Sequence, residues 1–401
     1  MRFLPVSALR GVTAGAGSAL SALWTFPSML LSAFLVGWGA EAAQFLISQG
    51  LALAALAWLQ TLPEFAVEAV IAWQAGRDPG QAHLAIANLT GAIRLLVGLG
   101  WPMIYFVAAF FSRKDRLDVL VVELDREHAV EIVGMIPPLL WFVVIWIRRS
   151  IGWTDAVILI GMYAAYLRVL WQCPPHAEEE IDEAPAVSRW AYGLGGARRV
   201  LAIAGLFLVG GALLYVTAHP FLLSMLAVAG SVGVSDFVLV QWVAPFLSEF
   251  PEKLTAFNWA RRVKHAPMAL MNMASSNINQ WTLLAAMIPL VYGWSHALAH
   301  GSWVTFHFDG AQQVEIGLTV AQSAVAVLVL ADMRFHWYDA TLLFVLWMVQ
   351  FLVPHWREEI TVLYLAWGLV LVGLAAAGRR PLTAFAAFRD VYGETRARTR
   401  A

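Results

Sequence analysis

Charged residues and cysteines are both scarce in this sequence. Of its 401 residues only 13% are Asp, Glu, Lys or Arg, and 60% are hydrophobic, whereas about a quarter of a soluble globular domain is charged. The formal net charge is −1 and no large basic cluster is present, so the composition does not indicate nucleic-acid binding. The single cysteine, Cys173, excludes a disulfide framework and a cysteine-based zinc site. The composition is typical of a multi-pass membrane protein, embedded in the lipid bilayer.

Long apolar runs predict the membrane-spanning helices, each of which needs about 20 mostly apolar residues. On that basis the sequence predicts an all-α protein with eleven spans. We expect them near residues 27–47, 50–75, 81–111, 130–147, 153–171, 200–228, 235–260, 266–293, 314–331, 338–354 and 360–377.

The same reading divides the chain into six segments. They are an N-terminal leader (1–26), a first repeat of five spans (27–172), an acidic cytoplasmic linker (173–199), a second repeat of five spans (200–354), an additional transmembrane helix (360–377) and a basic cytoplasmic tail (378–401). We interpret the leader as an entry into the first span rather than as a removed signal peptide. The linker is acidic and proline-containing, so we expect it to be solvated and too short for a folded regulatory domain.

The basic residues predict the orientation. With the N-terminus outside, 17 Arg and Lys residues fall on the cytoplasmic side and six on the outer side, as the positive-inside rule requires. The sequence therefore predicts an external N-terminus and a cytoplasmic C-terminus. We expect the membrane to be the inner (plasma) membrane of a prokaryote.

Short motifs recur in the same order in the two halves. The sequence LPEF at Leu62–Phe65 corresponds to FPEK at Phe250–Lys253. An NLTGAI segment begins 24 residues after Glu64, and an NMASSN segment begins 20 residues after Glu252. Because each half contains an odd number of spans, the second copy must enter the membrane in the opposite orientation. This inverted-repeat plan is typical of secondary transporters, whose sites lie near the bilayer midplane.

Prolines and carboxylates in the first motif point to that site. Pro63 and Pro251 are predicted to interrupt helices at membrane depth, which is tolerated where the chain is packed in protein or lines a cavity. Ionised side chains there cost roughly 2.5–3.5 kcal/mol each on insertion scales. The four carboxylates concerned are Glu64, Glu68, Glu249 and Glu252. Their placement in both halves predicts a shared cation site.

These motifs resemble those of the calcium/cation antiporter superfamily, in particular its sodium/calcium exchanger branch. The resemblance extends over about residues 35–354 and includes the first-helix segment WGAEAAQFLISQG. It implies two inverted five-helix repeats and secondary active antiport of inorganic cations, with alternating access and no cofactor. By resemblance, Glu64 and Glu252 bind the transported cation, and Thr61, Ser248 and Asn277 complete its coordination.

Several positions depart from the family pattern. Ile93 stands where the first repeat needs a counterpart of Asn277, and Arg94 follows it, so we expect Arg94 to pair with Glu64 or Glu68. Glu249 replaces a serine, and Lys253 follows Glu252. Glu68, Glu249, Arg94 and Lys253 are therefore candidates for charge balance or proton coupling. The departures leave three functions open: calcium exchange for sodium, antiport of sodium or another cation for protons, and a membrane scaffold that does not transport.

Two other interpretations are less favoured. An intramembrane hydrolase would need a nucleophile or an acid–base pair without a duplicated partner, whereas these carboxylates recur in both halves, so the sequence does not favour an enzyme. His296 and His300, four residues apart and near His307 and Asp309, could bind zinc if helical, although histidines at a membrane interface are common. The glycines of GLG, at 98–100, are interpreted as helix packing or a kink.

Overall fold

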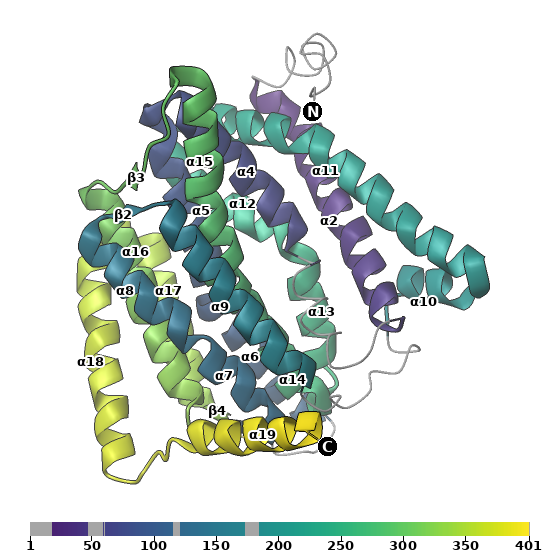
Figure 1. The fold of residues 1–401 in the computed structure, drawn as a ribbon, viewed down its shortest axis with the longest axis vertical. Coiled ribbons are helices and arrows are strands. Elements are labelled where there is room, and N and C mark those ends of the chain that lie inside the picture. Colours follow the sequence, from purple (N-terminus) through teal and green to yellow (C-terminus); the bar gives the residue numbers. More distant parts are fainter. Residues whose placement is uncertain (1–17, 47–58, 60, 115–120, 173–183, 401) are drawn as a thin grey trace.

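The protein is almost entirely helical (Figure 1). The computed structural model describes residues 18–46, 59, 61–114, 121–172 and 184–400. Most of the predicted leader, the first part of the predicted span 50–75 and most of the acidic part of the linker lie outside the described residues.

Within its described residues, the first half contains six helical units. They are α2 (Ala22–Gln44), α4 (Leu62–Arg77), α5 (Ala82–Leu95) continuing through the π-helical turn η3 (Leu96–Gly100) into α6 (Trp101–Lys114), α7 (Ala129–Gly134), α8 (Ile136–Arg148) and α9 (Trp153–Gln172). Two short strands, β1 (Val121–Glu123) and β2 (Ser150–Ile151), precede α7 and α9.

The second half repeats this order. Its helices are α11 (Gly196–Val232), α12 (Asp236–Ser248), α13 (Phe250–Ala260), α14 (Ala266–Asn279) continuing through η7 (Gln280–Leu284) into α15 (Ala285–His300), α16 (Gly310–Leu330) and α17 (Trp337–Leu352). The strands β3 (Phe306–His307) and β4 (Arg334–His336) precede α16 and α17. Three further helices are α10 (Ala186–Gly193), α18 (Arg357–Ala376) and α19 (Thr383–Arg400).

Ten of the eleven predicted spans coincide with apolar helices. Eight helices of the described chain are long and apolar enough to cross a membrane, and Asp236–Ser248 and Trp337–Leu352 are shorter apolar helices. The remaining predicted span, 50–75, overlaps α4, which carries two buried glutamates. The chain is therefore an all-α, multi-pass membrane protein.

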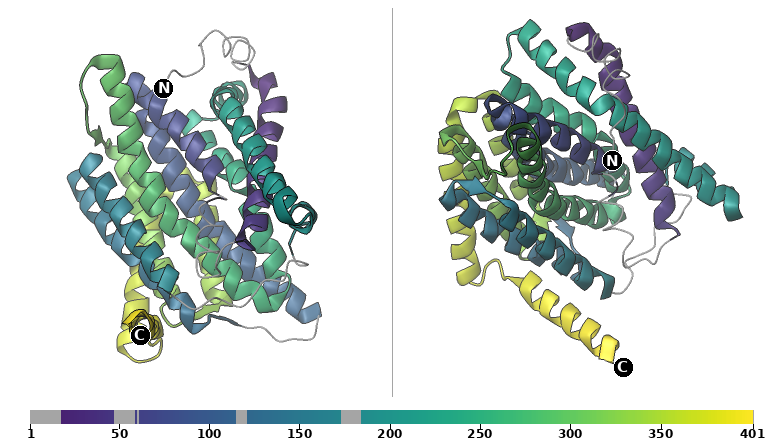
Figure 2. Two further views of the ribbon diagram at one scale, coloured as in Figure 1. Left: turned by 45° about the vertical axis from the view of Figure 1, so that its right-hand side comes forward. Right: turned by 45° about the horizontal axis from the view of Figure 1, so that its top comes forward.

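Three of the predicted non-membrane segments contain helical structure that the sequence analysis did not assign to them. α2 begins at Ala22, inside the predicted leader, and α10 occupies part of the predicted solvated linker, where Ser188 is buried against α2. The tail is also structured, because α19 lies across one end of the bundle (Figure 2) with Ala384 and Val391 buried. Hydropathy could not indicate α10 and α19, since each is stabilised by contacts with distant parts of the chain. The start of α2 is different, because this apolar helix extends over Ala19–Ala43.

Arg380 fixes the turn between α18 and α19. Its guanidinium donates to Asp332 and to Asp339, both at 2.8 Å, and to the Val329 carbonyl at 3.2 Å. Further along, Arg126 donates to Glu394 at 2.8 Å. These contacts hold α19 against the loops that flank β1 and β4.

The two halves are related in detail. Each of the two π-helical turns begins eight residues after a motif asparagine, η3 after Asn88 and η7 after Asn272. β1 pairs antiparallel with β4, and β2 pairs antiparallel with β3, so each ribbon takes one strand from each half. Figure 1 places β4 at one end of the bundle and β2 and β3 at the other. We refer to these as the β1–β4 end and the β2–β3 end.

Glycines allow the helices to approach closely. A Cβ added at Gly91 of α5 would lie 1.8 Å from the Gln241 carbonyl oxygen of α12, so the two backbones are in contact. A Cβ at Gly98 in η3 would meet Trp347 at 2.3 Å. The interpretation of the GLG glycines as packing positions is thus confirmed. These contacts hold α5 against α12 and η3 against α17.

Candidate functional site

The carboxylates of the repeated motif are all buried. Glu64 and Glu68 lie on α4, and Glu252 lies on α13. Glu249 is the single residue between the end of α12 and the start of α13. None of the four is exposed. Pro63 and Pro251 occupy the first turns of α4 and α13, where proline removes no helical hydrogen bond. The proline motif therefore begins a helix and places a glutamate in its first turn in both halves.

Gln280 joins the carboxylates of the two halves. Its side-chain amide donates to both oxygens of Glu64, at 3.1 and 3.3 Å, and to Glu249 at 2.8 Å. Glu64 also lies within electrostatic range of Glu252 and Lys253. We call Glu64, Glu249, Glu252, Lys253 and Gln280 the carboxylate cluster.

Lys253 balances part of the charge of this cluster. Its ammonium donates to Glu249, one helical turn earlier, in a pair that is almost entirely buried. A buried ammonium–carboxylate pair is tolerable because each charge satisfies the other. Two of the four candidates for charge balance or proton coupling, Glu249 and Lys253, are thus partners of each other.

Glu252 retains coordinating capacity. Ser276 donates to its Oε1 at 2.5 Å, while Oε2 has no hydrogen-bond partner among the described residues. Neither side-chain atom of the neighbouring Asn277 has a partner in the same part of the chain. Buried polar atoms are normally paired, so these oxygens are suited to a ligand.

The two predicted hydroxyl ligands differ in their surroundings. Thr61 accepts a bond of 2.5 Å from Asn279, whose side-chain oxygen has no described partner. Ser248 instead donates to the Ala244 carbonyl of its own helix at 2.9 Å. Thr61 is therefore tied to the polar face of α14, whereas the hydroxyl hydrogen of Ser248 is engaged within α12.

Ser276, Asn279 and Gln280 donate hydrogen bonds to predicted site residues, and the sequence prediction did not include them. They lie with Asn277 in one polar run, inside a segment otherwise apolar enough to cross the membrane. That run is the signal that could have identified them, although the motif itself covers only its first part.

The predicted pairing of Arg94 with Glu64 or Glu68 is wrong. Arg94 pairs with Glu315, donates to Gln350 at 2.9 Å, and lies 5.2 Å from the ring centre of Trp242. Glu68 instead accepts a 2.7 Å bond from Asn88. Arg94 is six positions after Asn88 on the same helix. At about 100° per residue, its side chain points about 120° away from the face on which Asn88 meets α4.

Glu315 is the centre of a second buried network, separate from the carboxylate cluster. It forms ion pairs with Arg94 and, at 2.5 Å, with Arg357, and it accepts a hydrogen bond of 2.7 Å from the Gln241 amide. The equivalent residue of the first half, Glu131, is equally buried, and its Oε2 has no partner in the described chain. Glu131 and Glu315 correspond because each is the centre of a Val-Glu-Ile sequence, at Val130–Ile132 in the first half and Val314–Ile316 in the second. These two equivalent glutamates therefore have different electrostatic surroundings.

Within the described residues, no three His, Cys, Asp or Glu side chains are gathered closely enough to hold a metal ion. A cation bound at the carboxylate cluster would therefore need amide, hydroxyl or carbonyl oxygens in addition to carboxylates. The zinc interpretation of His296 and His300 also lacks a third ligand; their rings lie 4.6 Å apart, and His296 contacts the Ser302 carbonyl at 2.8 Å.

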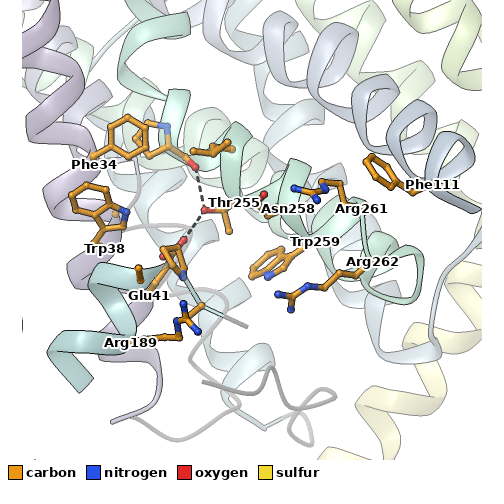
Figure 3. Close-up of a pocket in the computed structure, with 16 residues that line it drawn as sticks. Phe34, Trp38, Glu41, Phe111, Arg189, Thr255, Asn258, Trp259, Arg261 and Arg262 are labelled. Carbon is orange, nitrogen blue, oxygen red and sulfur yellow. Dashed lines mark hydrogen bonds between the residues drawn. The ribbon is translucent and has the colours of Figure 1, made fainter. Parts of the chain in front are cut away.

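A cavity of about 490 Å³ lies beside this motif (Figure 3). It lies between α2, α10 and α13, and Pro251, which directly precedes Glu252, forms part of its wall. Inside it, Glu41 accepts from Thr255 at 2.6 Å and from Ser188 at 3.1 Å. The cavity thus brings a further buried carboxylate to one side of the motif helix.

Comparisons with known proteins find a matching family and similar solved structures. A family model described as sodium/calcium exchanger protein matches residues 17–172 and 202–355. The crystal structure of the H+/Ca2+ exchanger CAX is 31% identical, covers 94% of this chain and 92% of its own, and has a TM-score of 0.84.

Two structures of the sodium–calcium exchanger NCX_Mj share the fold. One is 17% identical, covers 83% of this chain and 97% of its own, and has a TM-score of 0.53. The other is 18% identical, covers 84% and 99%, and has a TM-score of 0.55. A comparison with curated proteins found no match.

Proposed function

The chain belongs to the sodium/calcium exchanger protein family, and on that premise we propose that it exchanges calcium for protons across the membrane. The observation that carries the proposal is a buried cluster to which both halves contribute carboxylates, Glu64 from the first and Glu252 from the second. A cation bound between the halves can be exposed alternately to either side as they move, from a site near the midplane.

The unpartnered oxygens favour calcium as the cargo. Calcium takes six to eight oxygen ligands, including carboxylates, amides and waters. Glu64 and Glu252 would supply the charged ligands, and Asn277 and Asn279 would supply amide oxygens. Thr61, bonded to Asn279, is a further oxygen ligand in this proposal. Ser248 donates its hydroxyl hydrogen to the Ala244 carbonyl, so it could coordinate calcium only through the lone pairs of its hydroxyl oxygen.

The charge of the cluster and the function of a similar protein both favour protons over sodium as the counter-ion. Lys253 balances Glu249, so the remaining pair of glutamates matches the charge of one calcium ion. When calcium leaves, protons can neutralise the same carboxylates, since clustered buried carboxyl groups bind protons readily. The 31% identical relative is itself an H+/Ca2+ exchanger. Sodium exchange is the alternative that the transport experiment distinguishes.

Alternation follows from the cost of buried charge. An empty, fully ionised cluster would resist movement between low-dielectric surroundings, whereas calcium or protons would neutralise it and permit movement. Glu68, bonded to Asn88, is the nearest further proton acceptor on α4 in this scheme. This requirement for an occupied site would make the protein an exchanger rather than a channel.

The transport test uses purified protein in proteoliposomes. We expect a proton gradient to drive calcium uptake and a sodium gradient at constant pH to drive none. Calcium uptake driven by sodium would assign the counter-ion to sodium instead. If protein that elutes as a folded species moves calcium under neither gradient, the transporter proposal is wrong and the scaffold interpretation takes its place.

We also propose an inverted repeat with an external N-terminus. Exchanging the halves converts the β1–β4 ribbon into the β3–β2 ribbon at the opposite end of the bundle, which supports inversion. The basic residues that flank β1 and β4 support a cytoplasmic location for that end. The membrane in this proposal is the inner membrane of a prokaryote.

The orientation predicts which introduced cysteines can be labelled. With Cys173 replaced by Ser, a membrane-impermeant maleimide added to intact cells should label Ser302→Cys at the β2–β3 end. It should label Asp125→Cys, at the β1–β4 end, only in everted vesicles. Both positions are exposed. The opposite pattern would assign the N-terminus to the cytoplasm, and labelling of both from one side would contradict the inversion.

A further inference from the structure

Lys253 and Glu249 form a pair that only one half of the molecule has. When the LPEF and FPEK motifs are superposed, the counterpart of Glu249 is Thr61 and that of Lys253 is Phe65. The first half therefore lacks both the carboxylate and the ammonium. The two charges occur together, at positions four residues apart on one helical face.

This pair belongs to the carboxylate cluster rather than to a separate structural contact. Gln280 donates to Glu249 at 2.8 Å and, with the same nitrogen, to Glu64 at 3.1 Å. Glu249 is fully buried, and the Lys253 side chain is only 7% exposed. Both charges therefore act on the same low-dielectric space as Glu64 and Glu252.

In net charge, the carboxylate cluster equals three carboxylates with one monovalent cation already bound. Glu64, Glu249 and Glu252 contribute three negative charges when ionised, and Lys253 contributes one positive charge. Two negative charges remain, which one divalent ion neutralises. Without Lys253, the same three carboxylates would require an additional monovalent ion.

We propose that the Lys253 ammonium is a tethered cation, held where a second, monovalent ion would otherwise bind beside Glu249. An ammonium group carries the charge of a sodium ion and donates up to three hydrogen bonds. Because it is covalently attached, its effective concentration at Glu249 is high and it cannot leave with the cargo. It therefore restricts the cluster to one exchangeable divalent ion and makes calcium binding independent of sodium. This inference rests on the proposed calcium site.

Removing the ammonium alone should create a sodium site. In full-length Lys253→Met in detergent, we expect sodium chloride to raise the melting temperature above that in choline chloride at equal ionic strength. Wild type should show no difference between the two salts. The double variant Glu249→Gln/Lys253→Met, which lacks both charges, should also show none. If Lys253→Met elutes as a folded protein and shows no sodium-specific stabilisation, the proposal is overturned.

A charge comparison tests the proposal even if Lys253→Met does not fold. Glu249→Gln leaves the ammonium without its partner, so it competes with calcium at Glu64 and Glu252, and the calcium Kd should rise by about tenfold or more. Glu249→Gln/Lys253→Met restores two net negative charges and should bind calcium within about threefold of wild type. Equal losses in both variants would contradict a tethered cation. Absence of calcium binding in wild type would instead refute the proposed function.

Discussion

Glu252→Gln should abolish calcium uptake in proteoliposomes. The substitution preserves the shape of the side chain and its bond from Ser276, but it removes one of the two charges left for the cargo. Even residues that only support a metal ligand typically contribute 10- to 100-fold to metal affinity, so loss of a charged ligand should reduce calcium binding by at least about 100-fold. The measurements are calcium flux under a proton gradient and equilibrium calcium binding in detergent.

The matched control for this experiment is Glu131→Gln. Glu131 is a buried glutamate of a membrane-spanning segment, but it lies on α7 and outside the carboxylate cluster. The control variant should retain calcium uptake close to that of wild type. Uptake that survives in Glu252→Gln would remove Glu252 from the cation site. Loss in both variants would point to a general effect of removing buried carboxylates.

Glu315→Gln should destabilise the protein by about 3–5 kcal/mol, the cost of leaving a buried charge without its partner. Glu315 is the carboxylate that Arg94 and Arg357 share, and Arg94 is fully buried. Arginine keeps its charge in proteins, so both guanidinium groups would face a neutral amide. A lowered midpoint of unfolding in detergent, by heat or by denaturant, is the expected measurement.

Glu131→Gln again provides the comparison, because it is the same substitution at the equivalent position of the other half. In the described structure Glu131 has no arginine partner, so its replacement should change the unfolding free energy far less. Because Arg357 begins α18, Glu315→Gln should also expose this helix to proteolysis. Equal stabilities of the two variants would show that the arginine network is not a major source of stability.

The carboxylate cluster could be predicted from the sequence only in part. The proline–glutamate motif identified Glu64 and Glu252 because it appears twice, in positions that a membrane span would not otherwise tolerate. The NMASSN motif that ends at Asn277 was part of the prediction, but Gln280, three residues beyond it, was not. Gln280 contacts Glu64 across 216 positions of sequence, and no local pattern indicates a contact of that kind.

The sequence by itself determined the membrane character, ten of the helical spans and the division into two related halves. These properties depend on apolar length and motif order, which are local along the chain. Only the tertiary structure decided the partner of each buried charge: Arg94 pairs with Glu315, and Gln280 joins Glu64 to Glu249. The physical reason is that a charge in a low-dielectric interior pairs with whichever group the packed helices bring to its face, and that choice depends on all the helices together.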